Sequence, residues 1–156
     1  MKKTEIKPGM FWYCDGSFSF IKENKKVKAI VELVEDDTIY GDLSASDKFD
    51  DLQEDYRNWY QINRNHLKCH YRCNRKEKIV VYDIKQLEKI YNNYSAIKQA
   101  FETIGKDYRM ESYWTSTEVN ENKALAFSFV RGEVEEQFKL FSRFFRPILA
   151  AKLEDR

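Results

Sequence analysis

The sequence predicts an α+β domain in which antiparallel β-hairpins pack against one or two helices. Short turn signals at Asp15-Gly16, Asp36-Asp37 and Arg131-Gly132 lie between β-favouring segments, which is typical of hairpins. One long stretch, 84–104, repeats apolar residues at helical spacing. The chain has 156 residues, with many Phe and Tyr and few Gly and Pro. This length and composition predict a single domain over 1–156 with a substantial core.

The N-terminal part is predicted to form two hairpins. A strand over 10–14 turns at Asp15-Gly16 into the alternating segment 17–21. A β-branched, apolar strand over 27–34 then turns at Asp36-Asp37 into a strand over 38–40. Farther on, Ser46 is predicted to cap a short helix over 48–60, whose apolar residues recur at spacings of three and four. A loop over 61–78 follows it.

The amphipathic stretch gives the most specific helix signals. Asp83 has the position of an N-cap, and Gln86 is placed to complete a capping box with it. Asn92-Asn93 divides the periodic run into two helices, and Gly105 ends it. A short strand over 78–82 precedes these helices. Their apolar face is expected to pack on the terminal sheet.

The last part of the chain is predicted to form a three-stranded antiparallel sheet. Its strands are expected over 113–118, over 124–130 and after Gly132, where glycine supplies the positive φ of a tight turn. Trp114 is expected in the core. The apolar residues near the end of the chain outnumber what one strand face can bury, so some are expected to form an exposed contact patch; they are Phe138, Leu140, Phe141, Phe144 and Phe145. The competing explanation is a thick core between sheet and helix.

Two motifs carry a resemblance to a known family, and the Asp15-Gly16 hairpin extends it toward the N-terminus. The motifs are Tyr113-Trp114-Thr115-Ser116-Thr117-Glu118 and Phe145-Arg146-Pro147-Ile148. The chain resembles the bacterial domain family that includes the C-terminal domain of collagen-like adhesins (the major paralogous domain), a branch of the C-type-lectin-like fold. The middle, about 44–78, departs from the family pattern, since Val81-Tyr82-Asp83-Ile84 stands where a Trp-Arg-Leu-Pro-like entry to the helix is expected.

The resemblance implies a C-type-lectin-like domain whose chain ends lie close together. It also implies a loop-rich surface on the terminal sheet that binds a protein or glycan ligand, in the manner of bacterial surface, adhesin or phage-receptor domains. The calcium motifs of sugar-binding C-type lectins are missing, since Pro8 and Pro147 are the only prolines. The related formylglycine-generating enzymes use a late cysteine pair, and no cysteine follows Cys73.

The candidate ligand-binding residues lie in the polar loops and turns of the terminal sheet. They are Glu118, Asn120, Asn122, Arg131, Glu133, Phe141 and Arg143. Function is therefore predicted to be non-enzymatic recognition of a protein or glycan, with no cofactor. A Cys–His nucleophilic pair would need a turn that exposes the nucleophile, and nothing in the sequence marks one.

A basic segment supplies the alternative. Glu32 to Asp55 holds ten acids and one base, whereas Gln61 to Lys78 holds six bases and one acid. A polyanion such as a sulfated glycan or nucleic acid would meet Arg64, Lys68, Arg72, Arg75 and Lys76. The competing explanation is two solvated segments that attract each other. The overall charge of +1 argues against a nucleic-acid partner.

A metal site is the weakest of the predicted alternatives. His66, Cys69, His70 and Cys73 offer soft ligands at spacings of three, one and three. Structural zinc sites usually combine two separated pairs, so reduced cysteines beside surface histidines are the competing explanation. The three cysteines do not make a disulfide framework. The sequence has no apolar run of membrane-spanning length and no signal peptide, which predicts a cytoplasmic chain, or a surface or secreted one whose leader was removed.

Overall fold

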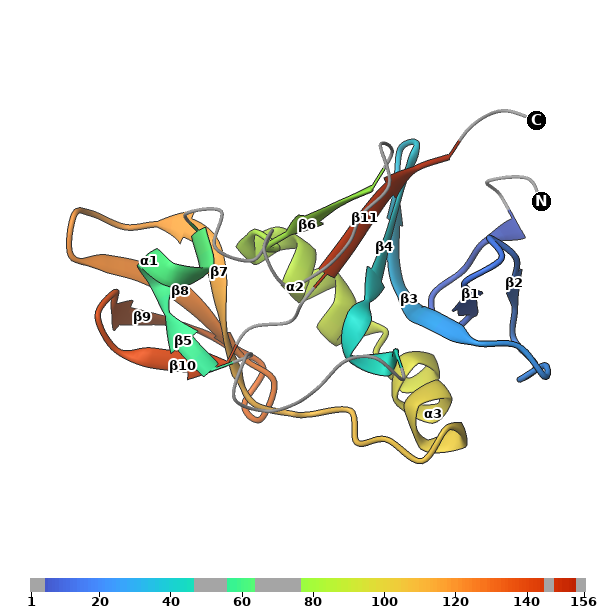
Figure 1. Cartoon of the computed structure of the whole chain (residues 1–156). Helices are drawn as coiled ribbons and strands as arrows, with labels where there is room; N and C mark the ends of the chain where they lie inside the picture. The colour runs from blue at the N-terminus through green and yellow to red at the C-terminus, as the bar shows by residue number, and fades with distance from the viewer. Residues whose placement is uncertain (1–4, 47–55, 64–76, 145–147, 154–156) are drawn as a thin grey trace.

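In the described residues, two β-sheets enclose a helical layer, and a further short helix lies beside the second sheet (Figure 1). The structure is a computed structural model, which describes residues 5–46, 56–63, 77–144 and 148–153. It bears out the predicted α+β class. Within these described ranges, no helix has both the length and the apolar character needed to cross a membrane.

In the part of the chain that the structure describes, sheet A has six strands, all paired antiparallel, in the order β2-β1-β3-β4-β11-β6. Both predicted N-terminal hairpins are present in it. The strands are β1 (Phe11–Tyr13), β2 (Phe18–Ser19), β3 (Val27–Glu35), β4 (Thr38–Asp42), β6 (Glu77–Val80) and β11 (Ile148–Lys152). The last strand lies between β4 and β6, and Ile6 and Leu153 pack in the same apolar cluster on the outer face of the sheet.

Among the described residues, sheet B has five strands in the order β5-β10-β7-β8-β9. They are β5 (Tyr56–Asn58), β7 (Ser112–Glu118), β8 (Lys123–Ser128), β9 (Glu133–Phe138) and β10 (Ser142–Phe144). β7, β8 and β9 form the antiparallel ribbon that the sequence predicts. The end of the chain does not continue this ribbon, because Ile148–Lys152 joins sheet A and the three-residue β10 pairs in parallel with β7.

The two longer helices bury their apolar sides in the core between the sheets. α2 (Ile84–Asn92) begins at the predicted capping box of Asp83 and Gln86, and α3 (Ser95–Thr103) follows after a break at Asn93. α2 contacts β7 and β8 of sheet B and β3 of sheet A, and α3 contacts β3. Ile90, Ile97 and Phe101 are buried as predicted.

The predicted helix over 48–60 was wrong in its C-terminal part. Residues 47–55 lie outside the described part of the chain, but 56–58 form strand β5, which pairs with β10. The helix here, α1 (Trp59–Asn63), begins only at Trp59. Ser46 ends the 3₁₀-helix Leu43–Ala45, where its N–H donates to the Leu43 carbonyl. The spacing of the apolar residues suits a helix, but pairing with the short β10 holds the segment Tyr56–Asn58 extended.

A buried carboxylate lies in the core on the helix side of sheet A. Glu32 is 1 % exposed, and it accepts hydrogen bonds from the hydroxyls of Tyr82 (3.0 Å) and Tyr108 (2.9 Å). The register between β3 and β4 shifts between Val31 and Leu33. This bulge inserts Glu32 as an extra residue, so that Glu32 and Leu33 both face the same side of the sheet.

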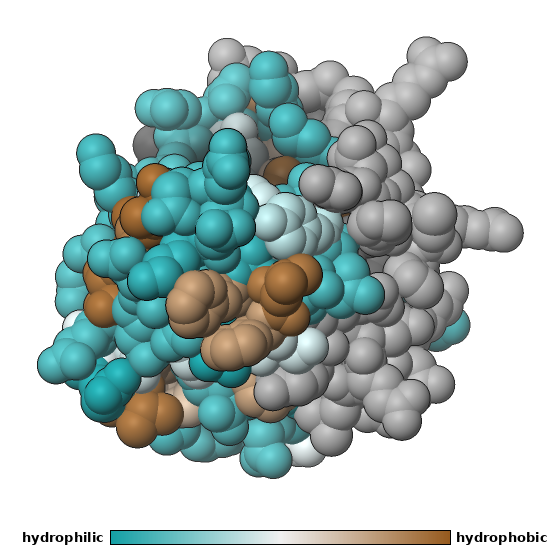
Figure 2. All heavy atoms as spheres, turned by 90° about the vertical axis from the view of Figure 1, so that its left-hand side faces the viewer, coloured by the Kyte–Doolittle hydropathy of each residue, from teal (hydrophilic) through white to brown (hydrophobic). Residues whose placement is uncertain are grey.

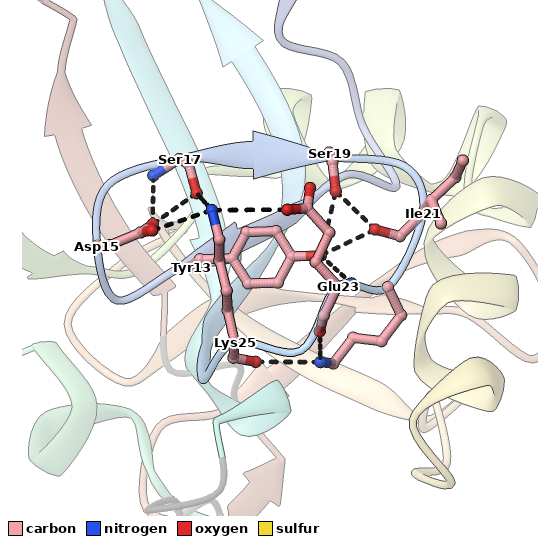
Figure 3. Close-up of polar contacts among 8 residues, drawn as sticks. Tyr13, Asp15, Ser17, Ser19, Ile21, Glu23 and Lys25 are labelled. Atoms are coloured by element: carbon pink, nitrogen blue, oxygen red, sulfur yellow. Dashed lines mark hydrogen bonds and ion pairs between the residues drawn. The ribbon is translucent and has the colours of Figure 1, made fainter.

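A hydrogen-bond network around Tyr13 fixes the first hairpin and the loop after it (Figure 3). The buried Tyr13 hydroxyl donates to the Ile21 carbonyl (2.9 Å) and accepts from the N–H of Glu23 (2.9 Å). Ser19 lies 3.1 Å from the same hydroxyl. One phenol therefore closes a loop whose apolar residues, Phe20 and Ile21, point into solvent.

The turn of this hairpin is held by Asp15. Its Oδ1 accepts from the N–H (2.9 Å) and the hydroxyl (2.5 Å) of Ser17, and Lys25 lies 3.0 Å from its Oδ2 (Figure 3). The Ser17 hydrogen bonds, followed by Lys25, lower the pKa of Asp15 to about 2. The carboxylate therefore stays ionised, and its support of the folded state is lost only as the pH falls from about 4 through about 2.

Gly132 is expected to tolerate a side chain poorly. Its φ is +68°, and an added Cβ would lie 2.7 Å from the Tyr91 hydroxyl and 2.8 Å from ring carbon Cζ. Gly132→Ala should lower the free energy of unfolding by about 2–3 kcal/mol, because backbone strain adds to the displacement of Tyr91. Gly105→Ala is the matched control, since Gly105 has a φ of +73° but open space around it. It should cost only about 1 kcal/mol in urea denaturation. Equal losses would contradict the role of Tyr91.

Candidate ligand-binding surface

An exposed apolar surface lies at the end of sheet B where β9 passes into β10. Phe138, Leu140 and Phe141 are 49 %, 75 % and 51 % exposed, and the two phenylalanine rings pack edge to face with centroids 5.5 Å apart. Figure 2 shows the side of the molecule that carries sheet B, with apolar groups gathered near its centre among hydrophilic ones. We call Phe138, Leu140 and Phe141 the apolar tip. Exposed apolar clusters with a polar rim are typical of interaction sites.

Lys139 holds the apolar tip in its outward position. Although it lies between Phe138 and Leu140, Lys139 is only 2 % exposed. Its Nζ lies 2.7 Å from Glu118 Oε2 and 4.3 Å from the ring centroid of Trp59. The Lys139 N–H donates to the Asn122 carbonyl (2.8 Å), and the Lys139 carbonyl accepts from the Trp59 N–H (3.0 Å). With this residue anchored inward, its apolar neighbours face solvent.

Two cations flank the rings of the apolar tip. Lys123 Nζ lies 5.0 Å from the Phe138 ring centroid, and the Arg143 guanidinium lies 5.9 Å from that of Phe141. Arg143 also donates to Gln137 Oε1 (2.8 Å). Arginine and aromatic residues are frequent in binding hot spots, and a cation beside an aromatic ring is attracted to the face of that ring.

The β7–β8 turn next to the apolar tip is internally braced. Asn120 Oδ1 accepts from the N–H groups of Asn122 (2.8 Å) and Lys123 (2.9 Å). The Tyr60 hydroxyl of α1 donates to the Glu121 carbonyl (3.0 Å). The side-chain oxygen of Asn120 therefore shapes the turn, and the surface is preformed rather than loose.

The structure divides the predicted ligand-binding residues between two places. Glu118, Asn120, Asn122, Phe141 and Arg143 lie at the end of sheet B that carries the apolar tip. The register of the β8–β9 hairpin pairs Lys123 with Phe138 at that end and Ser128 with Glu133 at the other.

Arg131 and Glu133 therefore lie at the opposite end of this hairpin. There, Arg131 Nη2 lies 2.9 Å from Glu135 Oε2 and its Nε lies 4.0 Å from Glu133 Oε2. The predicted set is thus not one site. Of the residues proposed for an apolar contact patch, Phe138, Leu140 and Phe141 are exposed, whereas Phe144 is half-buried against the core. Phe145 lies outside the described residues, and contact with a ligand stays a prediction.

The sequence analysis did not identify Lys139 as a buried anchor, nor its contacts with the rings of Trp59 and Tyr60. A signal was present, since Lys139 is the single charged residue in the run from Phe138 to Phe141. In a turn with three outward apolar groups, the intervening polar residue is free to point inward. What could not be read from the sequence is that Trp59, 80 positions earlier, supplies the ring beneath it.

The predicted basic segment and metal cluster fall outside the described part of the chain. This holds for Arg64, Lys68, Arg72, Arg75 and Lys76, and equally for His66, Cys69, His70 and Cys73. Both remain predictions. Within the ranges that the structure describes, no group of three or more His, Cys, Asp or Glu side chains is placed to hold a metal ion, and Cys14 is an exposed free thiol.

A groove of about 770 Å³ lies near the N-terminus of α2, between the ends of β4, β6 and β11. Its lining includes Tyr40, Lys78, Asp83, Gln86 and Lys152. Asp83 and Gln86 are bonded to each other in the capping box, and Gln86 Nε2 also donates to Glu35 Oε1 (2.9 Å). Burial raises the pKa of Tyr40, so its phenol stays neutral. Much of this polar lining thus supports the fold.

Comparison of the sequence with protein-family models and with curated proteins finds no match. A function for this chain is therefore inferred from its own residues, and the preformed apolar tip is the feature that most resembles a binding surface.

Proposed function

We propose that this chain is a non-enzymatic recognition module with a C-type-lectin-like fold, which binds a protein or glycan through the end of sheet B. The return of β11 to β4, and the shared packing of Ile6 and Leu153, support the close chain ends that this fold would have. The helices between two sheets agree with the same architecture. On this proposal, the module belongs with the bacterial surface and adhesin domains that its motifs resemble.

One observation carries the proposal: three neighbouring apolar side chains are held in solvent by a buried lysine. Full burial of one large apolar side chain stabilises a protein by about 1.5–3 kcal/mol. Much of this stabilisation is missing at Phe138, Leu140 and Phe141, which are half to three-quarters exposed. Inward anchoring of Lys139 adds the desolvation of a charge. Contact with a ligand would recover the apolar part of this free energy. Rigid rings flanked by Lys123 and Arg143 suit both a protein surface and the apolar face of a sugar.

The test uses a glycan array and a displayed random-peptide library as probes. We expect ligands captured by the wild-type chain to bind Phe141→Ala at least about tenfold more weakly, as for a hot-spot aromatic. Val130→Ala is the matched control, because Val130 is 70 % exposed but lies at the other end of the β8–β9 hairpin. Val130→Ala should bind like the wild type. If Phe141→Ala binds normally, or if only Val130→Ala loses binding, the site proposed here is wrong.

A further inference from the structure

We propose that the free edge of β9 binds an extended polypeptide segment by strand addition, and that this segment carries a basic residue between alternate apolar residues. The inference rests on the proposed recognition function and names the ligand class for the same end of sheet B. The edge, the side chains along it and their charges each contribute an independent argument.

The first argument is the open hydrogen-bonding edge. β9 is an edge strand of sheet B, and in the described part of the chain it pairs with β8 alone. The N–H of Lys139, the residue after β9, donates to the Asn122 carbonyl (2.8 Å). Lys139 and Asn122 are therefore a hydrogen-bonded pair of the β8–β9 ladder. Because such pairs alternate along an antiparallel ladder, the bonded residues of β9 are Gln137, Glu135 and Glu133.

The intervening residues of β9 therefore turn their backbone groups away from β8. They are Val134, Glu136 and Phe138. The Phe138 carbonyl accepts from the N–H of Phe141 (3.0 Å) in the following turn. Three N–H groups and the carbonyls of Val134 and Glu136 then face outward. This row is the template that an added strand uses in β-augmentation.

The second argument is the side-chain pattern along this edge. Val134, Glu136 and Phe138 alternate with the other β9 residues and so share one face, and all three are exposed. Val134 is 46 % exposed and Phe138 49 % exposed. A strand added at the edge would place its own side chains directly opposite these three. Apolar residues fit opposite Val134 and Phe138, and Phe141 extends the apolar contact beyond the end of the strand.

The third argument is charge. An opposite charge across from Glu136 is favourable, whereas a like charge is not. Glu133, with a side chain 65 % exposed, adds a second carboxylate to the edge. A second copy of β9 would bring these carboxylates against each other, which disfavours a dimer through this edge. A basic, alternating segment is therefore the occupant that the edge fits best.

The test selects random nonapeptides displayed on phage against the wild-type chain and compares two variants at one position. Glu136→Pro removes an outward N–H without removing a bond to β8, because the Glu136 N–H faces away from that strand. Glu136→Gln removes only the charge. We expect enriched peptides to alternate apolar residues around Lys or Arg. Binding should fall at least about tenfold in Glu136→Pro, and about two- to fivefold in Glu136→Gln.

A second measurement does not depend on the folding of the proline variant. In an enriched synthetic peptide, N-methylation of the amides that face β9 should abolish binding to the wild-type chain, whereas methylation of the alternate amides should not. Binding that tolerates every methylation, or that is unchanged in a folded Glu136→Pro, overturns strand addition. So does capture of glycans alone.

These outcomes are distinguishable from failure of the proposed function. If strand addition fails but captured ligands still lose binding to Phe141→Ala, the recognition function stands with another ligand class. If neither the peptide library nor the glycan array yields a ligand, the strand-addition inference and the proposed function both fall.

Discussion

Replacing Glu32 with alanine is expected to lower the free energy of unfolding by about 3–5 kcal/mol, because two buried hydroxyls lose their carboxylate acceptor at about 1–3 kcal/mol each. The two hydroxyls belong to Tyr82 and Tyr108, which are 2 % and 5 % exposed. The substitution also removes side-chain volume from the core between the sheets. Urea denaturation followed by tryptophan fluorescence measures the loss.

Two variants separate the hydrogen bonds from the lost volume. Glu32→Gln keeps the volume and one carbonyl oxygen, so it should cost less, about 1–2 kcal/mol. Tyr82→Phe removes one of the two bonds and keeps the ring, with a cost of about 1 kcal/mol. If the free energy of unfolding of Glu32→Ala lies within about 1 kcal/mol of the wild-type value, the carboxylate does not organise this part of the core.

The same cluster should make the protein sensitive to alkali. Burial, followed by the negative charges of Glu32 and Asp42, raises the pKa of Tyr82 well above its ordinary 10.0. Below pH 10 the phenol is neutral in the folded and in the unfolded chain, so its ionisation does not lower the free energy of unfolding. Above pH 10 the unfolded chain releases this proton while the folded chain retains it, so stability falls as the pH rises. Tyr82→Phe should remove this part of the alkaline decline.

Local features of the fold could be read from the sequence. The capping box of Asp83 and Gln86, the helix break at Asn93 and the turns at Gly16 and Gly132 depend on residues within four positions of one another. The sheet to which the last strand belongs depends on distant partners instead. Ile148–Lys152 is a mostly apolar segment, and nothing in it indicates which sheet it joins. Its partner strand, Thr38–Asp42, lies more than 100 positions earlier in the sequence.

The β3 bulge and the division of the candidate site have similar causes. The run Val31-Glu32-Leu33 alternates like an ordinary strand, so nothing local shows that an extra residue aims Glu32 at two tyrosines. Arg131 and Phe141 are ten positions apart, and the intervening β9 carries them to opposite ends of a hairpin. Residues that are close in the sequence, such as Arg131 and Phe141, therefore do not form one site.

Trp114→Ala is the second substitution with a large expected effect, about 3–5 kcal/mol. Trp114 is 1 % exposed and packs with Trp59, Ile62, Ala124 and Ala126 on the face of sheet B that α1 covers. The Trp59 indole N–H donates to the Thr115 carbonyl next to it (2.8 Å). The same Trp59 ring underlies Lys139, so a cavity at Trp114 should loosen the anchor of the apolar tip.

Amide hydrogen exchange can separate this local effect from general destabilisation. In Trp114→Ala the N–H of Lys139, bonded to the Asn122 carbonyl, should lose more protection than amides in the β3–β4 ladder of sheet A. Trp12→Ala is the matched control. Trp12 is also buried, but it packs in the cluster on the outer face of sheet A. Its loss should cost a similar free energy while Lys139 stays as protected as the rest of sheet B. If both variants weaken Lys139 equally, Trp59 alone positions the tip, and the packing beneath it contributes only to global stability.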